Sequence, residues 1–114
     1  MNIQKFREVI NKRAATSDEY EFGVEQCWKE EIALLMEDIA SSIEFLKNDC
    51  TADEFSWISE VLDDIAERTG SEEFVECYKS LMLKFPEECI KYNIAGSIKF
   101  AEAALGVKGD GKKN

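Results

Sequence analysis

The region from Thr51 to Phe85 constrains the fold most, because it reads as two helices joined by a tight turn. Thr51 and Glu54 have the spacing of a capping box, in which a hydroxyl and a carboxylate each accept a hydrogen bond from a backbone amide. Gly70 suits the residue after a helix end, where positive φ is needed, and Ser71 can cap the next helix at once. The chain is therefore predicted to form a helical hairpin here.

Apolar residues recur every three or four positions along both halves of this hairpin, which is the spacing of one helix face. The first half contributes Phe55, Ile58, Val61, Leu62 and Ile65, and the second contributes Phe74, Tyr78, Leu81, Met82 and Phe85. An aromatic and aliphatic stripe of this kind is far more often core than a ligand site. We expect these side chains to meet in the hydrophobic core.

The N-terminal half shows the same helical spacing. Asn2 to about Arg13 is predicted as a first helix, with its basic side chains mostly off the apolar face. These basic residues either face solvent or pair with the acidic middle of the same chain. One long helix or two shorter ones follow, from about residue 17 to Asn48, with Trp28 in the core. Gly23 and Ser41-Ser42 are the expected places of a break.

Two further helices are predicted in the C-terminal third. Pro86 suits the first turn of a short helix, and a last helix runs from Ile94 until Gly106 ends it. Residues 107–114 are rich in glycine and lysine and are predicted to form a flexible tail. With one proline and no useful strand-like alternation, the chain is predicted to be all-α. We expect a single domain, residues 1–106, of five to six helices packed as antiparallel hairpins.

Negative charge is concentrated in the middle of the chain. The whole sequence has a net charge of −10, whereas residues 18–76 alone have a net charge of −16. This segment would repel a phosphate backbone, so direct nucleic-acid binding is not expected. It would attract a basic protein. The plainer alternative is that acidic helices only keep a small protein soluble.

The cysteine and histidine content argues against a metal site. Cys27, Cys50, Cys77 and Cys89 form no close pairs, and the chain has no histidine. A structural zinc site usually needs such pairs, so we expect free thiols and no metal or cofactor. No apolar run has the form of a signal peptide or a membrane span. These features predict a cytoplasmic protein that does not bind membranes.

Catalytic signatures are also missing from the sequence. There is no glycine-rich phosphate loop and no G-x-S-x-G nucleophile motif. Adjacent acidic pairs abound, but neighbouring residues on a helix point about 100° apart and do not easily share a site. We therefore expect a protein that is not an enzyme, and a carboxylate-dependent metal enzyme is a distant alternative.

The candidate site is an acidic stripe that contains a tryptophan. Several residues of the first half of the hairpin lie opposite its apolar face, at helical spacing. An exposed tryptophan among carboxylates is typical of a binding hot spot for a basic partner. The alternative is that another helix, such as the first, covers Trp57. The predicted partner-binding residues are Asp53, Trp57, Glu60, Asp64 and Glu67, together with the acidic edge Glu72, Glu73 and Glu76 of the second half.

That acidic edge has a plainer interpretation as well. Glu72 and Glu73 would start the second helix of the hairpin, and carboxylates at a helix N-terminus interact favourably with the helix dipole. The same residues therefore fit a structural role as well as a binding role.

Three runs in this region resemble a known class of protein. They are Phe55-Ser-Trp-Ile-Ser-Glu-Val-Leu-Asp-Asp-Ile-Ala, Ser71-Glu-Glu-Phe-Val-Glu and Lys84-Phe-Pro-Glu-Glu-Cys-Ile-Lys-Tyr-Asn-Ile-Ala-Gly-Ser-Ile98. They look like small bacterial immunity proteins encoded beside polymorphic or contact-dependent-inhibition toxins. The resemblance covers residues 55–105, about half of the chain. It implies a cytoplasmic inhibitor that blocks the active site of one cognate toxin domain, often a basic RNase or DNase.

A second class of function remains open. The chain could be a helical adaptor or a homodimeric interaction protein without a toxin partner, which would use its apolar faces rather than its charge.

Overall fold

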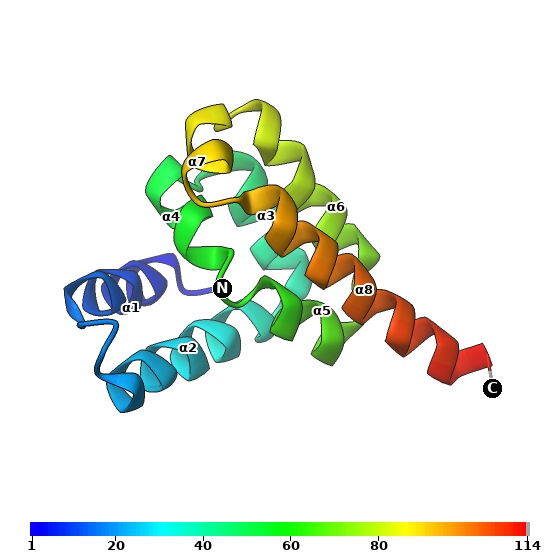
Figure 1. Cartoon of the computed structure of the whole chain (residues 1–114), viewed down its shortest axis with the longest axis horizontal. Coiled ribbons are helices and arrows are strands. Elements are labelled where there is room, and N and C mark those ends of the chain that lie inside the picture. Colours follow the sequence, from blue (N-terminus) through cyan, green and yellow to red (C-terminus); the bar gives the residue numbers. More distant parts are fainter. Residues whose placement is uncertain (114) are drawn as a thin grey trace.

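All secondary structure in the computed structural model is helical, over the part of the chain that it describes. Residues 1–105 are described in full, and residues 106–113 only as the continuation of the last helix. The elements are α1 (Ile3–Ala15), α2 (Glu21–Met36), α3 (Ile39–Asn48), α4 (Ala52–Ile58), α5 (Leu62–Thr69), α6 (Glu72–Ser80), the 3-10 turn η1 (Leu81–Leu83), α7 (Pro86–Lys91) and α8 (Ile94–Lys113) (Figure 1). The all-α prediction is confirmed. The predicted tail, residues 107–114, lies outside the fully described residues.

The predicted count of five to six helices is too low, since eight α-helices are present within residues 1–113. One of the extra boundaries falls between α2 and α3, at Asp38, whose side chain caps α3 by accepting from the Ser41 amide at 3.3 Å. The break therefore precedes Ser41-Ser42, and Gly23 lies inside α2. The Ser42 hydroxyl donates to the Leu35 carbonyl at 2.7 Å, which ties the corner together.

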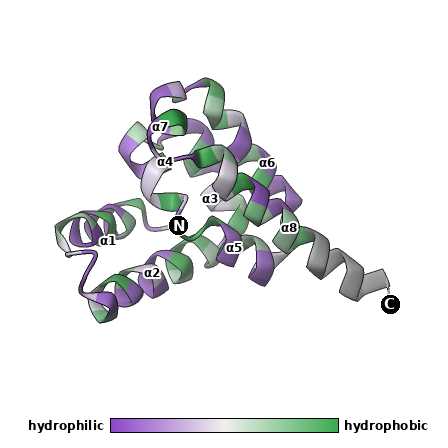
Figure 2. Cartoon of the chain, in the orientation of Figure 1, coloured by the Kyte–Doolittle hydropathy of each residue, from purple (hydrophilic) through white to green (hydrophobic). Residues whose placement is uncertain are grey.

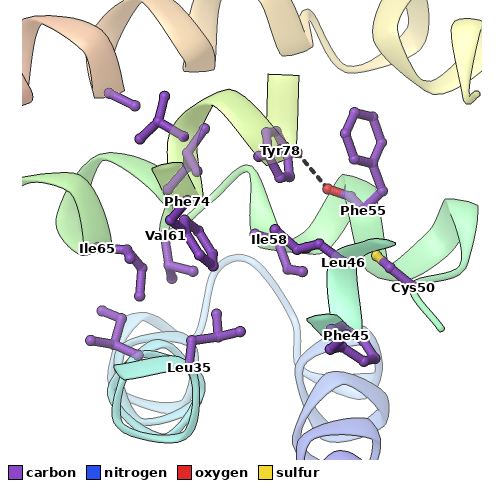
Figure 3. Packing of buried hydrophobic residues seen from close by; sticks show 14 of the residues in the cluster. Leu35, Phe45, Leu46, Cys50, Phe55, Ile58, Val61, Ile65, Phe74 and Tyr78 are labelled. Carbon is purple, nitrogen blue, oxygen red and sulfur yellow. Dashed lines mark hydrogen bonds between the residues drawn. The ribbon is translucent and has the colours of Figure 1, made fainter. Parts of the chain in front are cut away.

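The other extra boundary, which the sequence analysis did not predict, divides the first half of the hairpin. The amides of Ser59, Glu60 and Val61 bond to carbonyls three residues earlier, at 3.3, 3.1 and 3.0 Å. This tight winding ends α4 and leaves the Phe55 carbonyl free of a helical partner. The Tyr78 hydroxyl from α6 donates to that carbonyl at 2.6 Å (Figure 3). The hairpin is therefore α4, a turn and α5, followed by α6.

The local helix signals are confirmed at both ends of this region. Thr51 and Glu54 form a reciprocal capping box. Gly70 adopts φ 64°, and the Ser71 side chain accepts from the Phe74 amide at 3.1 Å. These residues fix the angle between α5 and α6 because glycine reaches this backbone conformation without a Cβ clash.

The core cluster is built from buried residues of α1 to α6 and of α8. Eight residues of the predicted hairpin stripe are buried, namely Phe55, Ile58, Val61, Leu62, Ile65, Phe74, Tyr78 and Leu81, and Met82 and Phe85 are partly buried. The Phe55 and Tyr78 rings stack with centroids 4.6 Å apart, and both belong to the buried cluster (Figure 3). Hydrophobic and hydrophilic residues alternate along the ribbons, as amphipathic helices require (Figure 2).

Helix α8 packs along α5, α3 packs against α6, and α1 packs on α2 at the other end of the molecule (Figure 1). Within the described residues, none of these helices combines the length and apolar character needed to cross a membrane. All four cysteines are free, and burial raises the pKa of Cys50 to about 12. Cys50 is therefore a packing residue rather than a reactive thiol.

Replacing Tyr78 with phenylalanine tests the capping of the Phe55 carbonyl. Tyr78→Phe keeps the stacked ring but leaves a buried carbonyl without its donor, so we expect the free energy of unfolding to fall by about 1–2 kcal/mol. Urea denaturation measures this change. The control Tyr92→Phe removes an exposed hydroxyl and should leave stability unchanged. Equal stability of Tyr78→Phe and the wild type would contradict the assigned capping role.

Candidate functional site

The turn between α4 and α5 divides the predicted acidic stripe. Asp53 and Trp57 lie on α4, Glu60 lies in the turn, and Asp64 and Glu67 lie on α5. Because helical geometry is interrupted at the turn, these side chains do not share one continuous face. Asp53 and Glu67 are exposed, whereas Trp57, Glu60 and Asp64 are half-buried.

Trp57 packs against the core instead of standing free in solvent. The Arg13 guanidinium from α1 lies over its ring, 5.0 Å from the centroid. The indole nitrogen is buried and has no hydrogen-bond partner among the described residues. The first helix therefore partly covers Trp57, as the alternative interpretation of the sequence anticipated.

Arg13 is the centre of the site, although no specific role for it was predicted from the sequence. Its side chain is only 5% exposed, and its Nε and Nη2 atoms donate to the two Glu60 carboxylate oxygens at 2.9 and 2.8 Å. Nη2 also donates to Asp18 at 3.0 Å. Trp28 donates its indole N–H to Glu60 at 3.0 Å. The hydrogen bonds with Glu60 raise the pKa of Arg13 further, so its guanidinium stays positively charged.

Two other basic residues of α1 also pair with the acidic middle of the chain. Arg7 donates to Glu54 at 2.7 Å and to the Asp49 carbonyl at 2.9 Å. Lys12 forms an ion pair with Glu30 at 2.7 Å. This confirms the alternative in which the basic first helix neutralises part of its own chain. The sequence showed only that basic residues cluster in the first helix. It could not show which carboxylates they pair with, because those carboxylates lie tens of residues away along the chain.

Glu31 on α2 is an unusual member of this region. It is fully buried, and neither carboxyl oxygen has a hydrogen-bond partner among the described residues. Burial, and to a lesser extent the nearby Glu60 charge, raise the pKa of Glu31 to about 8, and Arg13 opposes this shift. Glu31 is therefore predominantly neutral at pH 7.

A cleft of about 330 Å³ opens beside Arg13. Its walls are Arg13, Asp18, Ser56, Trp57, Ser59, Glu60 and Tyr92. The two serine hydroxyls donate to helix carbonyls, those of Asp53 and Ser56, at 2.7 and 2.6 Å. No base lies within hydrogen-bond reach of either hydroxyl in this wall, so the cleft has the features of a charged recess rather than those of a nucleophile and its base.

The acidic edge at α5 and α6 has a different character. Glu67, Glu72, Glu73 and Glu76 are all exposed, and no lysine or arginine within residues 1–105 lies at ion-pair distance from them. Burial and the neighbouring charge of Asp63 raise the pKa of Asp64. The structure therefore divides the predicted partner-binding carboxylates into two kinds, a distinction that the sequence analysis did not make. Those near α1 are neutralised internally, and those at the α5–α6 edge remain open to a partner.

The part of the chain described in full contains no group of three Cys, Asp or Glu side chains arranged to hold a metal ion. No protein-family model, curated protein or solved structure matches this chain. Its function is therefore inferred from its own residues and their geometry.

Replacing Arg13 tests the internal ion pair. Arg13→Ala leaves Glu60 half-buried without its cation and uncovers the Trp57 ring, so we expect the free energy of unfolding to fall by about 2–4 kcal/mol. Denaturant titration followed by tryptophan fluorescence measures both changes. Lys12→Ala, which removes an exposed ion pair on the same helix, is the control and should change little. If both variants unfold at the same denaturant concentration as the wild type, the ion pair of Arg13 does not stabilise the folded state.

Glu31 makes stability depend on pH in a direction that can be measured. Its carboxyl is protonated in the folded state well above its ordinary pKa, so the unfolded state releases the proton first as pH rises. The folded state should therefore lose stability between pH 4.5 and about 8. Glu31→Gln should flatten this slope and raise the free energy of unfolding at pH 8 by about 1–3 kcal/mol. Denaturant titrations across this pH range provide the measurement, and an unchanged slope would contradict the assignment.

Proposed function

We propose that this chain is an immunity protein of the bacterial type, which binds a basic toxin domain and covers its active site. The observation that carries the proposal is the acidic edge at α5 and α6. Its four exposed carboxylates, Glu67, Glu72, Glu73 and Glu76, have no cationic partner within residues 1–105. Unpaired surface charge of one sign attracts and orients a partner of the opposite sign.

A nuclease is the kind of toxin that such a surface fits best. An enzyme that acts on nucleic acid binds phosphate groups with lysine and arginine. Carboxylates held at the α5–α6 edge would take the place of those phosphates and pair with the same cations. Diffusional encounter would be fast at low salt, since complementary charges steer the two proteins together.

The α5–α6 turn supports this role because it presents the carboxylates on fixed elements. Gly70 and the Ser71 cap set the angle between the two helices, and Phe74 and Ile65 anchor both to the core. Binding then orders few additional groups, which lowers the entropic cost of association. Asp53 on α4 is also exposed, whereas Trp57 and Glu60 belong to the internal site.

A charge-reversal pair with a matched control tests the proposal. The partner is the toxin domain encoded beside this gene, with binding followed by calorimetry and by inhibition of its activity. Glu72→Lys/Glu73→Lys should weaken binding roughly 10- to 100-fold, a change of about 1.4–2.7 kcal/mol. Glu87→Lys/Glu88→Lys alters the charge equally at the same helix position, the first turn of α7, and should bind nearly as the wild type does. Equal loss in both variants would refute a specific role for this edge.

A helical adaptor is the second candidate, and a distinct observation favours it. Leu83, Ile90 and Phe100 are 92%, 86% and 71% exposed. Large apolar side chains exposed on neighbouring elements can form a self-association surface. Sedimentation at several salt concentrations separates the candidates. Salt-insensitive dimers that Leu83→Asp/Ile90→Asp dissociates would support the adaptor, and a monomer at all concentrations would exclude it.

A further inference from the structure

The corner between α1 and α2 carries an exposed aromatic pair. Tyr20 and Phe22 are 58% and 63% exposed, and their ring centroids lie 6.3 Å apart. This corner lies at one end of the molecule, away from α8 (Figure 1). Exposed tyrosine and phenylalanine side chains offer large contact areas and lose little conformational entropy on binding, so they are enriched in protein interfaces.

Two hollows lie beside Asp18 at this corner, and neither ring of the aromatic pair lines them. The first is the 330 Å³ cleft beside Arg13. The second has a volume of about 370 Å³ and is lined by Asp18, Glu21, Val24, Glu25 and Trp28. Asp18 is 86% exposed, yet its bond to Arg13 at 3.0 Å fixes its position between the hollows. The surface is therefore concave on both sides of a fixed carboxylate.

The negative charge of this surface favours the binding of a positively charged group. Residues 14–28 contain four carboxylates and no lysine or arginine. Asp18 pairs with Arg13, whereas Glu19, Glu21 and Glu25 are exposed without an ion pair among the described residues. A positively charged side chain in the second hollow would meet Glu21 and Glu25 directly, and its aliphatic part would pack against Val24.

We infer that this α1–α2 corner is the anchoring surface for a basic segment of the toxin domain, with Tyr20 and Phe22 as its aromatic contacts. The inference rests on the proposed function and adds a second contact region to it. It assigns to Tyr20 and Phe22 the anchoring role that the sequence analysis predicted for Trp57, whose ring Arg13 covers. An arginine or lysine side chain of the toxin would enter the second hollow and meet Glu21 and Glu25, and other side chains of the same segment would pack on the two exposed rings.

Gly23 provides a way to move one ring without removing it. A Cβ at this position would lie 2.6 Å from Cδ2 of Tyr20, so the ring packs directly on the Gly23 backbone. The neighbour is the far end of a flexible side chain, so Gly23→Ala should displace the ring and preserve α2. Gly23→Ala therefore tests whether the position of the Tyr20 ring matters for binding, while the ring itself is still present.

The test measures the affinity of the neighbouring-gene toxin domain for the wild type and four variants by calorimetry, each first checked for thermal unfolding. Tyr20→Ala/Phe22→Ala should weaken binding roughly 30-fold or more, as loss of a hot spot does. Gly23→Ala should weaken it less, by roughly 3- to 10-fold. Phe100→Ala removes an equally exposed ring from α8 and should stay within about twofold of the wild type. Glu21→Lys/Glu25→Lys should weaken binding without touching either ring.

The outcomes separate the two proposals. If the wild type binds and neither Tyr20→Ala/Phe22→Ala nor Glu21→Lys/Glu25→Lys weakens binding, the corner is not the anchoring surface and the proposed function still stands. If the wild type itself does not bind the toxin, both are overturned. Loss of affinity in both corner variants, with Phe100→Ala unaffected, supports the inference.

Discussion

The bidentate ion pair between Arg13 and Glu60 is the interaction on which the arrangement of α1, α2 and the α4–α5 turn depends. Arg13 is almost fully buried, and a buried guanidinium is tolerated only where its charge and its donors are matched. Glu60 supplies both oxygens, Asp18 accepts a further bond, and the Trp57 ring covers the open face. Three separate parts of the chain are thereby held at one point.

The same pair explains why the region after Thr51 bends. Apolar residues at positions 58, 61, 62 and 65 have the same spacing in a straight helix and in a bent one, so periodicity could not reveal the turn. The bend is stabilised by contacts from distant sequence. Arg13 holds Glu60, and the Tyr78 hydroxyl satisfies the carbonyl that the turn exposes. The capping box at Thr51 and the turn at Gly70 were predictable because their partners lie within a few residues.

The candidate site could be predicted only in part, for a related reason. The exposure of Glu72, Glu73 and Glu76 follows from helical spacing opposite the buried Phe74 and Tyr78. Helical spacing does not reveal that Trp57 is covered, because the covering group is a guanidinium on another helix. The boundary at Asp38 was within reach, since Asp38 and Ser41 have the spacing of a side-chain cap. The neutral buried Glu31 has no local sequence signature at all.

Negative charge in this protein therefore has two uses. Near α1, carboxylates form ion pairs with Arg7, Lys12 and Arg13, and these ion pairs stabilise the fold. At the α5–α6 edge and the α1–α2 corner the described structure leaves it unpaired, apart from Asp18. The most direct measurement of this division is the salt dependence of the affinity for the basic toxin domain that we propose as the partner. The account predicts that affinity falls at least about tenfold between roughly 0.05 and 0.5 M salt. Tight binding that does not change with salt would contradict it.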